Sequence, residues 1–458
     1  MINNLPKAYI DQMKRLLGEA GFFAYEKSLC EPVTRALRVN LLTRPDGTLP
    51  CQIEGVGEAV PWAKGCYFVT GDARPGLSPL HEGGLFYLQE PSALSAVSVL
   101  NPKPYERVLD LCAAPGGKST QIAGLMQGKG LLVCNEPVSS RAQILSRNIE
   151  RMGVRNAVVT SALPAQLAPH FEAFFDRILV DAPCSGEGMF RRQPEARDEW
   201  SENSPRGCAD RQMEILEEAA KMLIPGGAMV YSTCTFNDTE NEGVLARFLE
   251  IHPEFALEGF ELPGLPSGAR GYAHLYPHEI QGEGHFVSLL RKSADAPGAR
   301  ADIQEKPKRA AKPQRGKDGA RKKAEPVMAM PDVLAKGISF GCLHAAGDSL
   351  WALPDGLDDI ARLDGVRVLR TGLLLCHMEG KRCEPDHALA MALQPEEAAR
   401  TAGLSEKQAL AYQAGEALDL GELESGYTLL THCGVSLGFG KQAGGVMKNH
   451  YPKGLRRR

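Results

Sequence analysis

The fold of this 458-residue chain can be inferred outward from Asp110-Leu-Cys-Ala-Ala-Pro-Gly-Gly-Lys118. Apolar residues before and after Asp110 predict a buried strand over 107–111, and the paired glycines predict a tight turn into a helix. Glycines let the backbone approach a ligand closely, and the free amides at a helix start bind a carboxylate. The stretch therefore predicts the cofactor turn of an open α/β fold.

The sequence on both sides of this turn alternates strand and helix patterns, as parallel α/β sheets do. Four further buried strands are predicted at 131–135, 157–161, 177–181 and 228–232. The predicted fold class is therefore α/β, with a Rossmann-like core.

Composition and pattern divide the chain into five segments, because its length exceeds what one core accommodates. We expect a small N-terminal α/β module (1–75), an α/β core (76–292), a basic flexible linker (293–331), a small α/β module (332–395) and a β-rich module (396–458).

The net charge of −4 conceals two basic segments. Residues 293–331 carry ten Lys/Arg against five Asp/Glu, and residues 441–458 carry six Lys/Arg and no acid. Clustered basic charge of this kind is expected where a polyanion such as nucleic acid is contacted. The alternative interpretation is a solvated linker and a frayed terminus.

Several other classes of protein are disfavoured. No apolar run approaches the ~18–20 residues of a membrane helix, and the N-terminus lacks a signal-peptide pattern. The twelve cysteines contain no Cys-x-x-Cys pair, which favours buried or catalytic thiols over a disulfide framework and indicates a cytoplasmic protein. A P-loop is excluded because position 112, where its first glycine would stand, is cysteine.

A metal site is not expected either. Cys376, His377, Cys383 and His387 lie close together, but their spacing matches no common zinc pattern. His285 is interpreted as a core or rim histidine, and Trp200 as one of three tryptophans too dispersed to form a stacking platform.

Glu136 is expected at the end of the second core strand, 26 residues after Asp110. An acid at this place can accept hydrogen bonds from both ribose hydroxyls, as in dinucleotide folds. The alternative is a solvent-exposed glutamate. A ligand with a ribose and a carboxylate but no pyrophosphate fits S-adenosylmethionine better than NAD.

Two cysteines follow neighbouring strand ends, in Pro183-Cys184 and Thr233-Cys234. A thiolate that adds to carbon 6 of a pyrimidine makes carbon 5 nucleophilic, and a second group is needed for elimination. Asp181 could hydrogen-bond ring nitrogen 3 and the exocyclic amine, stabilising the charge that develops. The alternative is a pair of small buried hydrophobes.

The motifs together resemble the Sun-type RNA cytosine-C5 methyltransferase family. The resemblance rests on 109–118, Asp181-Ala-Pro-Cys-Ser-Gly-Glu-Gly188, Ser232-Thr-Cys-Thr235, Arg38-Val-Asn40 and Gln89-Glu-Pro-Ser92. It implies that residues 1–75 contact RNA and that 76–292 form the catalytic domain. It also implies that Cys234 is the nucleophile and that Cys184 assists product release. The cofactor-binding residues it implies are Cys112, Ala113, Ala114, Pro115, Gly116, Gly117, Lys118, Glu136, Arg141 and Asp181.

The resemblance extends to the C-terminus, where Gly438-Phe-Gly-Lys-Gln-Ala-Gly-Gly-Val-Met-Lys-Asn-His-Tyr-Pro-Lys-Gly454 is similar to the end of a PUA-like RNA-binding module. One departure stands out, because Ser161-Ala-Leu163 lacks the adenine-binding acid of some relatives. Backbone groups are the expected substitute.

The predicted function is that of a cytoplasmic, S-adenosylmethionine-dependent RNA (cytosine-C5) methyltransferase. Its expected partner is small-subunit (16S) ribosomal RNA or the small ribosomal subunit, with no DNA, membrane or metal, and the protein is expected to be a monomer. Two alternatives stay open, namely the same chemistry on tRNA and a non-catalytic ribosome-assembly factor. A DNA cytosine methyltransferase would use the Pro-Cys cysteine as nucleophile and needs a Glu-Asn-Val motif, which the chain lacks.

Overall fold

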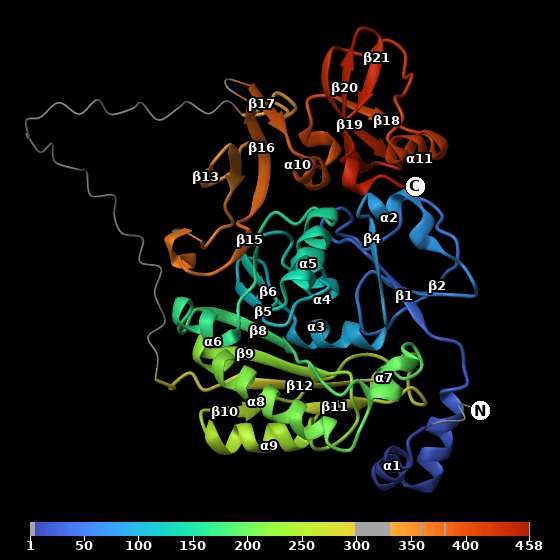
Figure 1. Ribbon diagram of the computed structural model, residues 1–458, viewed down its shortest axis with the longest axis vertical. Helices are drawn as coiled ribbons and strands as arrows, with labels where there is room; N and C mark the ends of the chain where they lie inside the picture. Colours follow the sequence, from blue (N-terminus) through green and yellow to red (C-terminus); the bar gives the residue numbers. More distant parts are fainter. Residues whose placement is uncertain (1–4, 298–329, 358–359, 380–381, 458) are drawn as a thin grey trace, which may run out of the picture.

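The computed structural model describes residues 5–297, 330–357, 360–379 and 382–457 (Figure 1). Most of the expected linker, residues 298–329, lies outside the described residues.

A nine-stranded mixed sheet forms the centre of the molecule (Figure 1), in the order β10-β12-β9-β8-β5-β6-β7-β15 with β11 paired to β12. Its strands are β5 (Arg107–Asp110), β6 (Leu131–Asn135), β7 (Ala157–Thr160), β8 (Phe175–Asp181), β9 (Leu223–Thr233), β10 (Phe255–Leu257), β11 (Tyr272–Leu275), β12 (His285–Lys292) and β15 (Val368–Arg370). Strands β5 to β9 run parallel, so the five predicted core strands are confirmed. The strand order reverses on either side of β5, and such a switch point is where open α/β sheets bind ligands.

Helices bury both faces of this sheet, because alternate strand residues face opposite sides. Leu109 belongs to one core and Val108 to the other. The first core is closed by α6 (Pro164–Leu167), α8 (Ser204–Met222) and α9 (Glu242–Ile251), and the second by α3 (Ser95–Leu100), α4 (Gly117–Leu125) and α5 (Ser139–Arg151).

The N-terminal module is larger than expected. It consists of helix α1 (Lys7–Ser28), which bends at Gly18, and a sheet in the order β2-β3-β1-β4. These strands are β1 (Arg35–Val39), β2 (Val56–Ala59), β3 (Cys66–Val69) and β4 (Phe86–Gln89). The boundary predicted at residue 75 is therefore wrong, because β4 pairs with β1 and carries the module's sheet to residue 89.

The segment 332–395 is tied to the core, because β15 joins the central sheet by pairing antiparallel with β7. The buried Arg370 side chain adds an ion pair with Glu150 of α5. The remaining strands form a second sheet in the order β13-β14-β16-β17, from β13 (Leu343–Ala346), β14 (Ser349–Ala352), β16 (Leu373–Glu379) and β17 (Arg382–Pro385).

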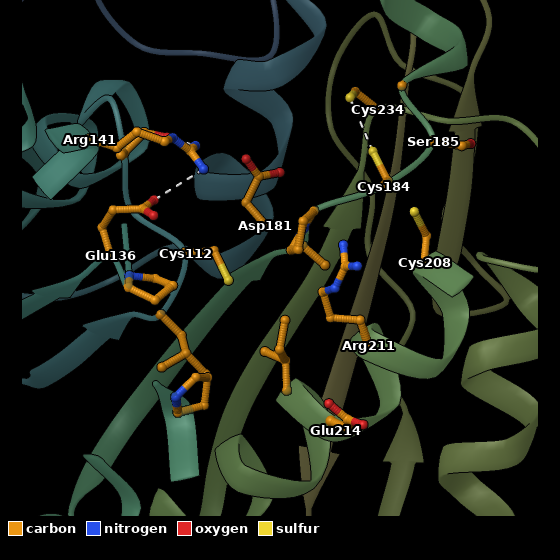
Figure 2. A pocket seen from close by; sticks show the side chains of 18 of the residues that line it. Cys112, Glu136, Arg141, Asp181, Cys184, Ser185, Cys208, Arg211, Glu214 and Cys234 are labelled. Carbon is orange, nitrogen blue, oxygen red and sulfur yellow. Dashed lines mark hydrogen bonds and ion pairs between the residues drawn. The ribbon is translucent and has the colours of Figure 1, made fainter. Parts of the chain in front are cut away.

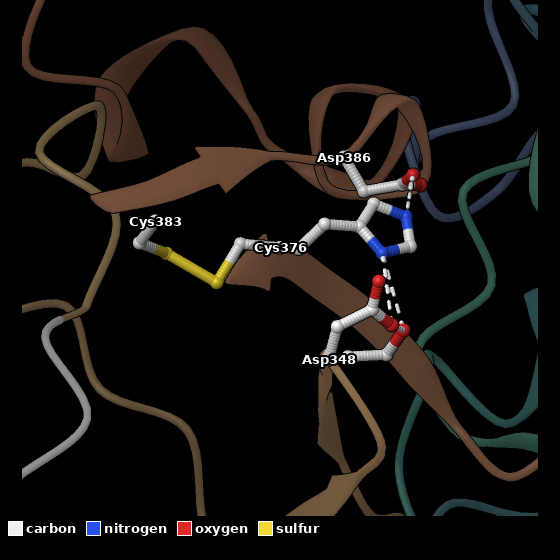
Figure 3. Close-up of a disulfide and its surroundings, with 6 residues drawn as sticks. Asp348, Cys376, Cys383 and Asp386 are labelled. Carbon is white, nitrogen blue, oxygen red and sulfur yellow. Dashed lines mark hydrogen bonds and ion pairs between the residues drawn. A yellow bond between two sulfur atoms is a disulfide. The ribbon is translucent and has the colours of Figure 1, made fainter. Parts of the chain in front are cut away.

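A disulfide joins Cys376 of β16 to Cys383 of β17 (Figure 3), a single pair that was not predicted from the sequence, while the other ten cysteines are free thiols. Beside it, the imidazole of His377 lies 3.2 Å from Asp386 Oδ2 and 3.1 Å from Ser349 Oγ. Within the described residues no group of three or more potential metal-ligating side chains comes together.

The C-terminal sheet has the order β18-β19-β20-β21 and packs with α10 (His387–Ala392) and α11 (Glu406–Ala414). Its strands are β18 (Thr401–Gly403), β19 (Gly426–His432), β20 (Val435–Ala443) and β21 (Val446–Asn449). The last residues dock on the N-terminal module, where the Arg457 guanidinium donates to the carbonyls of Leu77 and Ser78. The tail is therefore not a frayed end. None of the helices described is long and apolar enough to cross a bilayer.

Candidate active site

A cavity of about 860 Å³ lies at the carboxyl ends of β5, β6, β8 and β9 (Figure 2). Residues that follow these strands line it, together with side chains from α7 (Pro194–Glu199) and α8. Glu136 lies toward one end of the view and the two predicted catalytic cysteines toward the other, with Asp181 between them.

The structure brings Cys184 and Cys234 into contact, with 3.2 Å between their Sγ atoms. The cause is the parallel register of β8 and β9, in which Asp181 stands opposite Ser232. Cys184 follows Asp181 by three residues and Cys234 follows Ser232 by two, so both thiols reach the same point beyond the sheet.

The contact between the two thiols perturbs the titration of Cys184. The hydrogen bond with Cys234 and burial together raise the pKa of Cys184 well above its ordinary value. Either sulfur can donate in the S–H···S contact, and a Cys184 thiol that keeps its proton can donate to the Cys234 sulfur.

Asp181 is held as a carboxylate. Burial acts to raise its pKa, but Lys118 and His285 outweigh that effect and hold the pKa well below its usual range. Lys118 Nζ lies 2.7 Å from Oδ2, while Ser232 Oγ donates to Oδ1 at 2.9 Å and His285 Nε2 lies 3.6 Å from Oδ1. An anchored anion can accept hydrogen bonds from a substrate but is a poor proton donor at neutral pH.

Glu136 lies at the end of β6 with its side chain only 2 % exposed, so the alternative of a solvent-exposed glutamate is wrong. Its carboxylate accepts from the Val138 amide at 3.0 Å and lies 3.4 Å from the Arg141 guanidinium. Both side chains line the cavity.

The cofactor turn contributes less to the cavity than its sequence indicates. Among the described residues it supplies Cys112 and Ala114 to the lining, but not Ala113, Pro115, Gly116, Gly117 or Lys118. A Cβ atom on Gly116 would lie 3.2 Å from Leu145, and one on Gly117 would lie 3.2 Å from Tyr87. The close approach that these glycines permit is therefore to neighbouring protein segments.

A buried acceptor lies behind this turn. The Asp110 side chain accepts from Ser119 Oγ through Oδ2 at 2.6 Å, while its buried Oδ1 has no partner among the described residues. Burial raises the pKa of Asp110 to about 7. Glu136, which lines the cavity, provides acceptors for the hydroxyl groups of a nucleoside amino acid, and the Asp110 Oδ1 atom lies buried behind the turn, so the residues present fit S-adenosylmethionine.

The wall near Glu136 is largely apolar and includes Pro137, Leu163 and Pro164. The Leu163 amide already donates to Gln166 Oε1, and its carbonyl accepts from two amides of α6. The Ala162 amide is likewise engaged, by Asn135 Oδ1. An adenine amine is a donor and needs a carbonyl acceptor. The Leu163 carbonyl already accepts two hydrogen bonds, whereas among the described residues the Ala162 carbonyl accepts one, from Asn135 Nδ2 at 3.0 Å, and can accept a second.

Sequence reasoning missed a polar network behind the cysteines. The residues of this network lie within six positions after Cys184 or Cys234, and this closeness in sequence could have revealed them. They are Ser185, Glu187, Thr235, Asn237 and Glu240. It also missed Cys208 and Arg211 on α8, which line the cavity beside Cys184 (Figure 2).

Comparison with known proteins gives consistent matches along the chain. Residues 97–291 match the family model for the 16S rRNA methyltransferase RsmB/F. Three further models match on either side, namely the N-terminal domain of 16S rRNA methyltransferase RsmF at 5–91, the RsmF rRNA methyltransferase first C-terminal domain at 332–393 and the methyltransferase RsmF PUA domain at 399–457.

Curated relatives match over nearly their whole length. The ribosomal RNA small subunit methyltransferase F of Erwinia tasmaniensis is 32% identical over 98% of this chain and 96% of its own. That of Shewanella loihica is 33% identical over 93% and 90%. Among solved structures, a methyltransferase homolog protein from Pyrococcus horikoshii is 29% identical with a TM-score of 0.53, over 63% of this chain and 95% of its own.

Proposed function

Because this chain belongs to the 16S rRNA methyltransferase RsmB/F family, we propose that it transfers a methyl group from S-adenosylmethionine to carbon 5 of a cytosine in small-subunit ribosomal RNA. The observation that carries the proposal is the pair of contacting thiols at the cavity, with Asp181 held as an anion beside them. Cys234 is the nucleophile, Cys184 assists elimination and Asp181 supports the ring.

The first step is addition. The Cys234 thiol gives up its proton to solvent, and the thiolate sulfur forms a bond to carbon 6 while the electron pair of the 5,6 double bond moves to carbon 5, which becomes nucleophilic. Asp181 accepts a hydrogen bond from the exocyclic amine and orients the ring. Lys118, bound to Asp181 at 2.7 Å, lies where its positive charge offsets the negative charge that develops on the base.

S-Adenosylmethionine, when bound, supplies an electrophilic methyl group. Glu136 would hold its ribose hydroxyls, while Cys112, Ala114 and Pro137 form the nearby wall. The apolar wall also keeps water away from the cofactor end of the cavity.

The last step is elimination. The proton on carbon 5 passes to solvent, its electron pair re-forms the 5,6 double bond, and the bond from carbon 6 to the Cys234 sulfur breaks. Cys184 lies 3.2 Å from that sulfur with a raised pKa, so its thiol can donate a hydrogen bond to the departing thiolate.

The substrate is tested directly with purified protein and radiolabelled S-adenosylmethionine. We expect 5-methylcytidine, identified by nucleoside mass spectrometry, in 16S ribosomal RNA or small subunits, and none in tRNA or DNA. Methylation of tRNA would replace the proposed substrate. Cofactor binding without any methylated nucleoside would support an assembly factor.

Bisulfite sequencing of ribosomal RNA from a strain lacking the protein identifies the modified cytosine.

We also propose that the protein is a cytoplasmic monomer. Light scattering measures its oligomeric state.

The proposed role of Glu136 predicts a selective loss of cofactor affinity. Glu136→Ala is expected to weaken S-adenosylmethionine binding by about 1–3 kcal/mol, because charge-assisted hydrogen bonds to the ribose are removed. Calorimetry measures this, and RNA affinity should stay within twofold. Glu214→Gln, at another part of the cavity lining, is the matched control. Equal cofactor affinity in both variants would exclude Glu136 from the site.

The basic C-terminal module is proposed to contact the phosphate backbone of the RNA. Of its cations, Lys448 and Lys453 are exposed, whereas Arg457 is bound to the N-terminal module. Lys448→Gln with Lys453→Gln should weaken RNA binding at low salt and flatten the plot of log affinity against log salt by ~0.7–0.9 per lost contact. A salt series measures this slope, and an unchanged slope would contradict the role.

A further inference from the structure

The side chain of Glu187, three residues after Cys184, is a buried carboxyl group that accepts hydrogen bonds from several donors. It is 1 % exposed, and N–H groups from three separate segments point at its carboxylate. Oε2 accepts from the backbone amides of Phe236 and Asn237 at 2.9 and 3.0 Å. Oε1 accepts from Gln12 Nε2 at 2.9 Å and from Trp200 Nε1 at 3.2 Å.

These contacts tie together the two loops that carry the thiols. Phe236 and Asn237 directly follow the Cys234 motif, so the carboxylate bridges one cysteine loop to the other. Two further bonds reinforce the bridge: Gly188 N donates to the Cys234 carbonyl at 2.8 Å, and the hydroxyls of Ser185 and Thr235 lie 2.8 Å apart. The bridge therefore holds the two loops together beyond the strand ends, in addition to the register of β8 and β9 that brings the thiols into contact.

The same carboxylate reaches the N-terminal helix. Gln12 belongs to α1, and the aromatic rings of α1 contact both loops. Tyr9 packs against Phe190 and Trp200 with ring centroids 5.0 and 5.6 Å apart, and Tyr25 packs against Phe236 at 5.7 Å. The helix expected only to contact RNA is thus joined to the nucleophile loop.

We propose that Glu187 is a positioning residue that fixes the Cys234 thiol against Cys184, and that α1 and Trp200 belong to the same catalytic unit through it. The inference rests on the proposed function. Glu187 faces the protein interior, and it acts by satisfying five N–H groups that a neutral side chain could not satisfy together.

Glu187→Gln tests the proposal with little change in volume. The glutamine amide would point its own N–H groups at the N–H donors that now bind the carboxylate, and this would displace the Cys234 loop. We therefore expect kcat to fall about 100-fold, the usual effect of a small misplacement of reacting groups. The KM for RNA should stay within about threefold, because no RNA contact is removed. Trp200→Phe removes one donor and keeps most of the ring, and a loss of about 3–10-fold in kcat is expected.

Thiol separation is measured without any reaction on RNA. Diamide oxidises two adjacent thiols to a disulfide and is itself reduced to the hydrazine, so the rate of Cys184–Cys234 bond formation, followed by peptide mass spectrometry, reports their proximity. We expect this rate to fall about tenfold in Glu187→Gln. Trp62→Phe is the matched control, because it removes a buried indole bond to the Pro91 carbonyl, away from the cavity.

A kcat for Glu187→Gln equal to that of Trp62→Phe would overturn the proposal, and so would a lower kcat with an unchanged disulfide rate. Unaltered cofactor affinity shows that the variant is folded. If Cys234→Ala kept full activity, the proposed function would fail, whereas the disulfide rate would still report on Glu187 by itself.

Discussion

Cys234→Ala is expected to abolish methyl transfer, lowering kcat by roughly 10³-fold or more, which corresponds to about 4 kcal/mol of transition-state stabilisation. Carbon 5 of cytosine is a weak nucleophile, and only a bond from the Cys234 sulfur to carbon 6 activates it. Transfer of a tritiated methyl group to 16S ribosomal RNA measures the loss.

The control for this variant is Cys208→Ala, since Cys208 is a third thiol that lines the same cavity. We expect it to retain near-normal turnover. Cofactor affinity should be equal in both variants, because neither cysteine belongs to the wall around Glu136. Substantial activity in Cys234→Ala would exclude covalent catalysis by this residue.

Cys184→Ala is expected to trap the enzyme on its substrate. Addition and methyl transfer still proceed through Cys234, but the departing sulfur loses the hydrogen bond from its neighbour 3.2 Å away. A covalent protein–RNA adduct should therefore accumulate close to one equivalent, while multiple turnover falls by about 100-fold. Denaturing gel electrophoresis with labelled RNA detects the adduct.

The double variant Cys184→Ala/Cys234→Ala is the control, and it should form no adduct. The opposite pattern, with an adduct in Cys234→Ala and none in Cys184→Ala, would reverse the two roles. That is the arrangement of the DNA enzymes, in which the cysteine after proline attacks.

The contact between the two candidate catalytic cysteines was predictable because it depends on local register. Two predicted strands, each followed within three residues by a cysteine, are neighbours in a parallel sheet, and so their side chains meet. The position of Glu136 in the cavity was also predictable, because this residue directly follows a predicted core strand. His285 was interpreted as a core histidine, and its place beside Asp181 depends on β12 pairing with β9, which no local pattern reveals.

The glycine turn at 116–117 shows a second limit of prediction from sequence. A pair of glycines indicates that something approaches the backbone closely, but not whether it is a ligand or protein. Here Gly116 faces Leu145 of α5 and Gly117 faces Tyr87 of the N-terminal module, a contact distant in sequence. Likewise, the disulfide between Cys376 and Cys383 requires the hairpin of β16 and β17, which the cysteine spacing alone does not imply.

The basic tail was interpreted as either an RNA contact or a frayed end, and the structure makes truncation an unsuitable test. A chain ending at Gly440 would cut β20 and remove β21, so the whole C-terminal sheet would be disturbed. Substitution of exposed lysines leaves that sheet intact.

The edge strand β15 has a consequence for how the protein is synthesised. Every residue of the candidate site precedes it in the chain, yet the sheet that supports the site is completed only by Val368–Arg370. At a translation rate of 5–20 residues per second, β15 is synthesised on the order of 10–40 s after β7. During that interval the unpaired backbone of β7 is open to pairing with other nascent chains, so molecular chaperones are expected to matter most for this protein before translation ends.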